Sequence, residues 1–122
     1  MPTPNLIILY VEDTIASAAF YRKLLGIEPH AEFPGYSSFQ MDTGLTLGLL
    51  AKTSTAVVPS AAGDRTELAF MVKADDDVTA QYEDWKTKGL TIVQDLTRFE
   101  FGPSFVALDP DGHRLRVCLY DD

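Results

Sequence analysis

The feature that most constrains this chain of 122 residues is an internal repeat, in which both halves show the same order of predicted elements. Each half begins with a short β-favouring segment, continues with a segment of helical periodicity and ends with strand segments around a glycine-containing turn. The offset between matching landmarks grows from 61 residues at Val11 and Val72 to 68 residues at Gly44 and Gly112. The repeat predicts an α+β fold built from two βαβββ modules.

The length leaves room for one ordinary domain, so we expect residues 1–122 to form a single domain that contains both modules. The modules are expected at about 5–52 and 67–121. Between them, residues 53–66 are rich in Ser, Thr, Ala, Gly and Pro, which is typical of a linker. The predicted strands are 6–11, 36–42, 45–51, 67–73, 92–96, 105–108 and 114–120, and the predicted helices run from about 14 to 25 and from 75 to 88.

Composition excludes several classes of function. The net charge of -8 makes nucleic acid and anionic membranes poor partners. A single cysteine, Cys118, excludes an internal disulfide, and two histidines, His30 and His113, leave little for a metal site. The apolar run 6–11 is too short to span a bilayer, and we expect a cytoplasmic protein.

Alternation along the strands indicates which side chains share a face. In the last strand, Leu115, Val117 and Leu119 form an apolar face, while Arg114 and Arg116 point to the opposite face with Cys118. The continuous apolar run 6–11 predicts a strand that is buried on both faces. Residues 98–103 combine aromatic side chains with Gly102 and Pro103, which indicates a loop.

Three segments together resemble the vicinal-oxygen-chelate superfamily, which includes glyoxalase I, bleomycin-resistance proteins and extradiol dioxygenases. They are Leu9-Tyr10-Val11-Glu12-Asp13, the run 19–26 and Asp109-Pro110-Asp111-Gly112-His113. The resemblance covers essentially the whole chain. It implies two βαβββ modules whose mixed sheets curl into a cup, and a homodimer.

The resemblance also implies where a metal would bind, because metal-dependent members take ligands from the first and last strand of each module. The matching positions here are Leu6, Gly48, Glu67 and Arg116. Of these only Glu67 can ligate a cation, and the guanidinium of Arg116 would repel one. We therefore expect no metal and no other cofactor. An inward-turned His113 could restore a ligand, but a solvated position at the rim is the favoured interpretation.

Glu67 and Arg116 are expected on opposite strands and can instead pair with each other across the cup, either as a structural ion pair or as a polar anchor for a ligand. Exposed aromatic side chains could stack on a planar ligand, although Phe39 could equally be core and Phe99 or Phe101 could pack a dimer interface. The candidate ligand-binding residues are Leu6, Ile8, Tyr36, Phe39, Gly48, Glu67, Phe99, Phe101 and Arg116. No catalytic residue is assigned.

The resemblance is strongest to the phenazine-resistance branch. It implies a metal-independent protein that sequesters a planar aromatic antibiotic or a related metabolite and leaves it unchanged. The alternative is a glyoxalase-like lyase or isomerase that uses Glu67 as a base, with or without a metal. A non-catalytic module that binds a metabolite in a regulatory or biosynthetic context is a third possibility.

Overall fold

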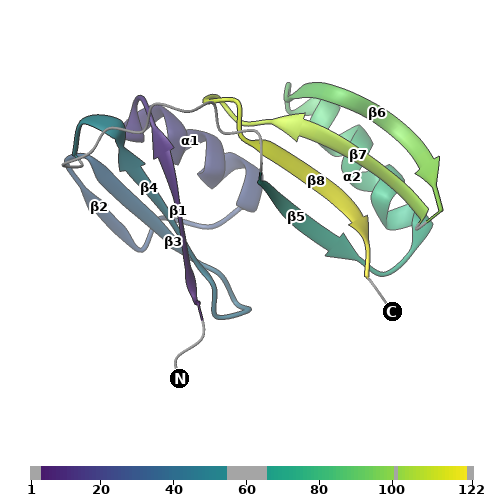
Figure 1. The fold of residues 1–122 in the computed structure, drawn as a ribbon, viewed down its shortest axis with the longest axis horizontal. Helices are drawn as coiled ribbons and strands as arrows, with labels where there is room; N and C mark the ends of the chain where they lie inside the picture. Colours follow the sequence, from purple (N-terminus) through teal and green to yellow (C-terminus); the bar gives the residue numbers. More distant parts are fainter. Residues whose placement is uncertain (1–3, 55–65, 101, 121–122) are drawn as a thin grey trace. The chain divides into compact units, whose positions relative to one another are not determined.

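The computed structural model describes residues 4–54, 66–100 and 102–120. Two compact units divide the chain, residues 1–61 and residues 62–122, and each is described by itself. Both units place one helix against one face of a four-stranded sheet (Figure 1). None of the helices in the described part of the chain is both long and apolar enough to cross a membrane.

The first unit follows the predicted order of strand, helix and three strands. Its elements are β1 (Leu6–Val11), α1 (Thr14–Leu25), β2 (Ala31–Phe33), β3 (Tyr36–Gln40) and β4 (Thr46–Ala51), followed by a 3₁₀ turn at Lys52–Ser54. The strands are arranged in the order β1-β4-β3-β2, with β1 parallel to β4 and the other pairs antiparallel.

The second unit repeats this topology. Its elements are β5 (Glu67–Val72), α2 (Asp75–Thr87), β6 (Thr91–Phe99), β7 (Gly102–Leu108) and β8 (Arg114–Leu119). The strand order is β5-β8-β7-β6, again with one parallel pair, β5 and β8. The predicted α+β fold of two βαβββ modules is therefore confirmed, with two mixed four-stranded sheets, neither of which closes on itself.

Local sequence explains where the two helices begin and end. The Asp13 carboxylate accepts hydrogen bonds from the backbone N–H groups of Ile15 and Ala16 at the start of α1, and Gly26 ends the helix in the left-handed conformation. At the start of α2, the Asp77 carboxylate accepts from the backbone N–H of Ala74 at 3.1 Å. Such side-chain caps satisfy N–H groups that have no partner within the helix.

Each unit has its core between its helix and one face of its sheet. Tyr21 of α1 and Phe39 of β3 are fully buried in the first unit, with ring centroids 6.5 Å apart. In the second, Trp85 of α2 packs edge-on against Phe105 of β7 at 5.3 Å. The face of each sheet opposite its helix is called the open face below.

The structure corrects two predictions about the strands. β1 is not buried on both faces: Leu6, Ile7, Ile8 and Tyr10 are exposed, because β1 is an edge strand and only Val11 reaches the core. The predicted loop at 98–103 is largely strand, since β6 extends to Phe99 and β7 begins at Gly102.

Most of the predicted linker 53–66, namely residues 55–65, lies outside the described residues. The single-domain assignment stays a prediction.

Candidate functional site

The open face of the second sheet carries Glu67 and Arg116, two of the residues predicted for the site, together with Arg114. Alternation places Glu67 on β5 and Arg114 and Arg116 on β8 on this face, while Leu115 and Val117 are fully buried on the other. β5 and β8 are parallel neighbours, and Glu67 lies directly opposite Arg114. The predicted pairing of Glu67 with Arg116 is present, but it joins adjacent strands of one sheet and does not cross a cup, because β5 and β8 are hydrogen-bonded neighbours.

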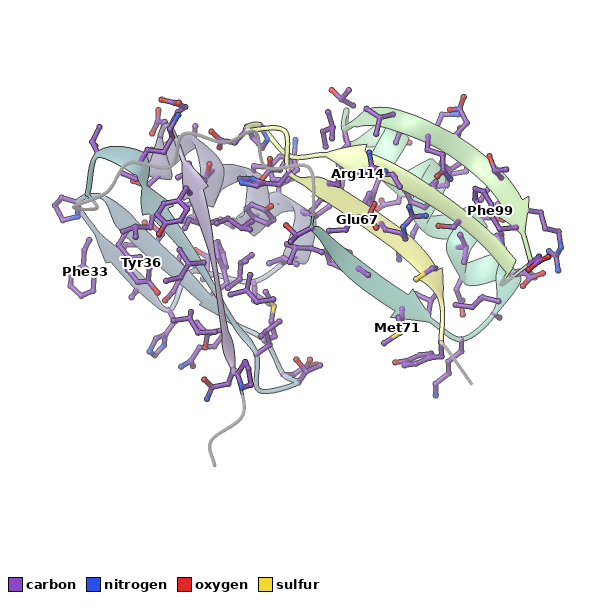
Figure 2. The ribbon with its side chains drawn as sticks, viewed as in Figure 1. Phe33, Tyr36, Glu67, Met71, Phe99 and Arg114 are labelled. Atoms are coloured by element: carbon purple, nitrogen blue, oxygen red, sulfur yellow. The ribbon has the colours of Figure 1, made fainter. Side chains whose placement is uncertain are left out.

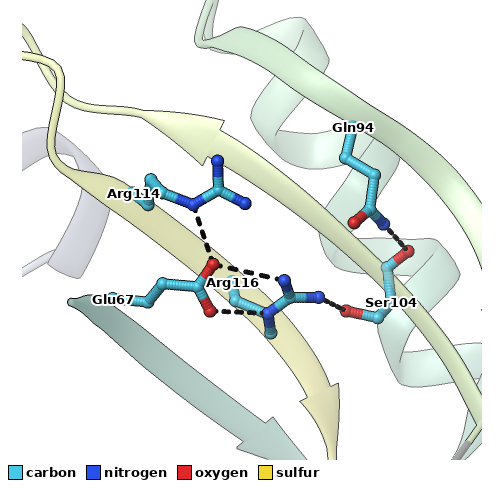
Figure 3. A network of polar contacts seen from close by, with 5 residues as sticks. All are labelled: Glu67, Gln94, Ser104, Arg114 and Arg116. Carbon is cyan, nitrogen blue, oxygen red and sulfur yellow. Dashed lines mark hydrogen bonds and ion pairs between the residues drawn. The ribbon is translucent and has the colours of Figure 1, made fainter. Parts of the chain in front are cut away.

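The carboxylate of Glu67 bridges the two arginines (Figure 3). Arg116 donates from Nε to Oε1 of Glu67 at 2.7 Å and from Nη2 to Oε2 at 3.2 Å. Arg114 donates from Nε to the same Oε2 at 2.8 Å. A further hydrogen bond, from Nη1 of Arg116 to the hydroxyl of Ser104 on β7 at 2.8 Å, fixes that guanidinium on both sides. The backbone carbonyl of Ser104 in turn accepts from the side chain of Gln94.

This network, consisting of Glu67, Arg114, Arg116 and Ser104, is called the arginine cluster below. Hydrogen bonding from Arg116, joined by that from Arg114, lowers the pKa of Glu67 despite its partial burial. The same contact raises the pKa of Arg116. Two guanidinium groups and one carboxylate leave the cluster with a net charge of about +1 at neutral pH, on a chain whose overall charge is -8.

The strand register shows which residues of the first unit correspond to this cluster. Leu6 pairs with Thr46 as Glu67 pairs with Arg114, and Ile8 pairs with Gly48 as Ala69 pairs with Arg116. Leu6 therefore matches Glu67, and Gly48 matches Arg116, as the repeat predicted.

Gly48 makes room for a neighbouring aromatic ring. A Cβ atom added at Gly48 would lie 2.9 Å from the hydroxyl oxygen of Tyr36, which is closer than real Cβ atoms come. In the second unit the corresponding pair is Arg116 and Ser104, since the register matches Tyr36 with Ser104. In the first unit the large side chain is Tyr36 and the small residue is Gly48. In the second unit the large side chain is Arg116, at the position of Gly48, and the small one is Ser104, at the position of Tyr36.

The other predicted residues of the first unit divide between the two faces. Leu6 and Ile8 are exposed on β1, 44% and 41% respectively, and are accessible to a ligand. Phe39 is fully buried beside Tyr21, so its assignment to the site is corrected to the core. Phe33, 63% exposed and directly opposite Tyr36 on β2, was not predicted as a site residue (Figure 2).

Phe99 is not brought together with Glu67. It lies at the end of β6, on the opposite edge of the sheet from Glu67 on β5 (Figure 2). Three strand spacings separate those edges, which amounts to about 14 Å across the sheet. Phe101 lies outside the described residues.

His113 is not a solvated residue at the rim. Its Nδ1 lies 2.7 Å from the carboxylate of Asp109, whose side chain is fully buried. The hydrogen bond that the Asp109 carboxylate accepts from the ring raises the pKa of His113, against the opposing effect of burial. Within residues 4–54, 66–100 and 102–120, no three His, Cys, Asp or Glu side chains are grouped so that they could hold a metal ion.

Two members of the arginine cluster were missing from the predicted site. Arg114 could have been found, because alternation in the last strand already puts it on the face of Arg116. Ser104 gave no such signal, since serine is common in turns and at surfaces. Only the pairing of β7 with β8 brings it to the guanidinium.

The fold and the repeated register define a protein of two βαβββ units. The chain belongs to the Glyoxalase/Bleomycin resistance protein/Dioxygenase superfamily, whose family model matches residues 3–117.

Two curated relatives are each 32% identical to this chain. The phenazine antibiotic resistance protein EhpR of Enterobacter agglomerans aligns over 98% of the chain and 93% of its own length. The glutathione transferase FosA of Serratia marcescens aligns over 93% and 77%, respectively.

Solved structures share the fold. A protein from Agrobacterium tumefaciens, determined by solution NMR, is 38% identical and superposes with a TM-score of 0.89 over the whole of both chains. A glyoxalase-related enzyme from Fulvimarina pelagi gives a TM-score of 0.83 at 23% identity, over 98% of this chain and 89% of its own.

Proposed function

We propose that this protein is a metal-independent small-molecule-binding protein that sequesters a planar aromatic antibiotic or a related metabolite. The observation that carries the proposal is the arginine cluster. At the position where the family resemblance implies a metal ligand, the guanidinium of Arg116 is fixed by Glu67 and Ser104. At this position the chain therefore has a permanently charged hydrogen-bond donor in place of a metal ligand.

The aromatic character of the ligand is supported by the first unit. Phe33 and Tyr36 are directly opposite each other on neighbouring strands, and Gly48 leaves the space that the Tyr36 ring occupies. Flat rings at an exposed surface suit a planar ligand, because stacking buries apolar area on both partners. The similarity to a phenazine antibiotic resistance protein favours the same class of ligand.

The alternative function is that of a glyoxalase-like lyase or isomerase. The similarity to a glutathione transferase supports an enzymatic function of this kind. Glu67 is poorly suited to act as its general base, because both carboxylate oxygens accept hydrogen bonds from guanidinium groups. These bonds also lower its pKa, whereas an effective base needs a pKa nearer to the working pH.

We further propose that the protein is a homodimer and acts in the cytoplasm. The run of exposed apolar side chains on the edge strand β1 supports self-association. A chain with a single cysteine forms no internal disulfide, which suits a reducing compartment.

Native mass spectrometry tests the binding proposal with phenazine, acridine and naphthalene derivatives as planar ligands and cyclohexane derivatives as non-planar controls. We expect about one planar ligand per chain, released with unchanged mass, and loss of binding in Tyr36→Ala. Ile15→Ala on α1, where the side chain is 82% exposed, is the matched control and should bind normally. Conversion of any ligand, or stoichiometric metal in the purified protein, would contradict the proposal.

A further inference from the structure

The two arginines of the cluster differ in how many of their donors are already used. Each of the three nitrogens of the Arg116 guanidinium makes a hydrogen bond, to Glu67 or to Ser104. Arg114 uses only Nε, toward Glu67. Among the contacts of the described residues, none involves Nη1 or Nη2 of Arg114, and in Figure 3 no dashed line joins this end of its guanidinium to the other residues drawn. Four N–H donors of Arg114 therefore have no partner among the described residues.

These four donors belong to a side chain that is held in place. The bond from Nε to Glu67 is 2.8 Å long, and the side chain of Arg114 is one-third exposed. A guanidinium that is oriented through Nε loses less freedom when its terminal nitrogens bind a ligand. The terminal edge of a guanidinium matches the two oxygens of a carboxylate.

The charge of the cluster selects the kind of group that fits. The single carboxylate of Glu67 neutralises one of the two guanidinium groups and leaves about one positive charge. A singly charged anion would balance this charge, whereas a doubly charged phosphate would leave the cluster with a net negative charge.

We propose that Arg114 is the anion-binding residue of this site and that the ligand is an aromatic acid, whose carboxylate pairs with the terminal nitrogens of Arg114. Arg116, which the sequence favoured as the polar anchor, is then a positioning residue that holds Glu67, and through it Arg114. This inference deepens the proposed binding function and rests on it.

The test compares two ligands of nearly equal shape, phenazine-1-carboxylate and phenazine-1-carboxamide, by isothermal titration calorimetry. A charge-assisted hydrogen-bonded pair should favour the carboxylate by about tenfold or more, and added salt should reduce the preference. Arg114→Gln should abolish the preference while amide binding is retained. Arg22→Gln, which removes a positive charge from the exposed pair with Glu28 on α1, should keep it.

Further arms separate this inference from the proposed function. If the carboxylate and the amide bind the wild-type protein equally well, or if Arg114→Gln keeps the preference, the role of Arg114 is overturned and sequestration stands. If non-planar cyclohexanecarboxylate binds as well as the aromatic acid and shifts the ¹⁵Nε NMR signal of Arg114, the anion site stands and preference for planar ligands fails. If no compound binds, both proposals fail.

Discussion

At the scale of single residues, the two units differ at one pair of corresponding positions on the open face. In each unit a long side chain occupies one position of the pair and a small residue occupies the other. The first unit places Tyr36 over Gly48, and the second places Arg116 against Ser104. The first sheet therefore carries an aromatic ring at this place and the second sheet carries a guanidinium group. The same backbone topology thus presents two chemically different surfaces.

The close approach of Tyr36 to Gly48 leads to a prediction for Gly48→Ala. The added Cβ would lie 2.9 Å from the Tyr36 hydroxyl oxygen, so the ring must move. We expect a loss of about 1–3 kcal/mol in the free energy of unfolding, measured by urea denaturation.

A double-mutant cycle provides the control for this prediction. In a Tyr36→Ala background the ring is absent, and Gly48→Ala should then be neutral or slightly stabilising, since alanine restricts the unfolded chain more than glycine. An equal cost of Gly48→Ala in both backgrounds would show that Tyr36 is not the group that requires glycine.

Glu67 predicts a dependence of stability on pH. Its pKa is lowered in the folded protein, chiefly by Arg116, so its contribution to stability is fully present above the ordinary value of 4.5 and is lost as the pH falls through the lowered value. Glu67→Gln should therefore be less stable than the wild-type protein above about pH 4.5, and the difference should shrink in more acidic solution.

Urea denaturation over a series of pH values measures this difference. Glu28→Gln is the matched control, because Glu28 forms an exposed ion pair with Arg22, and exposed pairs contribute little to stability. A difference between wild-type protein and Glu67→Gln that stays constant down to the most acidic pH would contradict the assignment.

At the scale of elements, the sequence predicted helices and turns better than strand environments. Caps and glycine turns are local signals, so the bounds of α1 and the turn at Asp109–Gly112 could be predicted from a few neighbouring residues. Whether a strand is central or at an edge depends on pairing with distant segments. The apolar run of β1 therefore suggested full burial, although β1 lies at the edge of its sheet.

The turn between β7 and β8 carries a second prediction about pH. The carboxylate of Asp109 accepts from the backbone N–H groups of Asp111 and His113 and contacts the His113 ring at 2.7 Å. The raised pKa of His113 means that its contribution to stability is complete below the ordinary value of 6.5 and is lost as the pH rises through the raised value.

We therefore expect the wild-type protein to lose stability as the pH rises above the ordinary value of 6.5, and His113→Gln to lose less. Thermal unfolding at several pH values measures the effect. His30→Gln, which changes the exposed second histidine, should retain the wild-type slope. If His113→Gln and the wild-type protein lose stability in parallel, the Asp109–His113 contact is not the source.

At the scale of the whole chain, the internal repeat explains how much of the site could be predicted. The offset of 68 residues between Gly44 and Gly112 predicts that Gly48 matches Arg116, and the strand register of the structure confirms this correspondence. The repeat says nothing about which side chains bond across strands. The contact from Arg116 to Ser104 needed the pairing of β7 with β8, which no local pattern specifies.

The exposed edge of β1 makes a prediction about assembly. Leu6, Ile7, Ile8 and Tyr10 are each more than one-third exposed, and an apolar edge strand is a template for association with another chain. We expect native mass spectrometry at micromolar concentration to give a species of twice the 13.5 kDa chain mass.

The variant Ile7→Lys should shift this species toward the monomer, because a charged lysine on an edge strand opposes pairing. Ile15→Lys introduces the same charge on α1, where the side chain is 82% exposed, and should leave the dimer intact. A wild-type monomer, or a dimer unaffected by Ile7→Lys, would show that β1 is not the dimer interface.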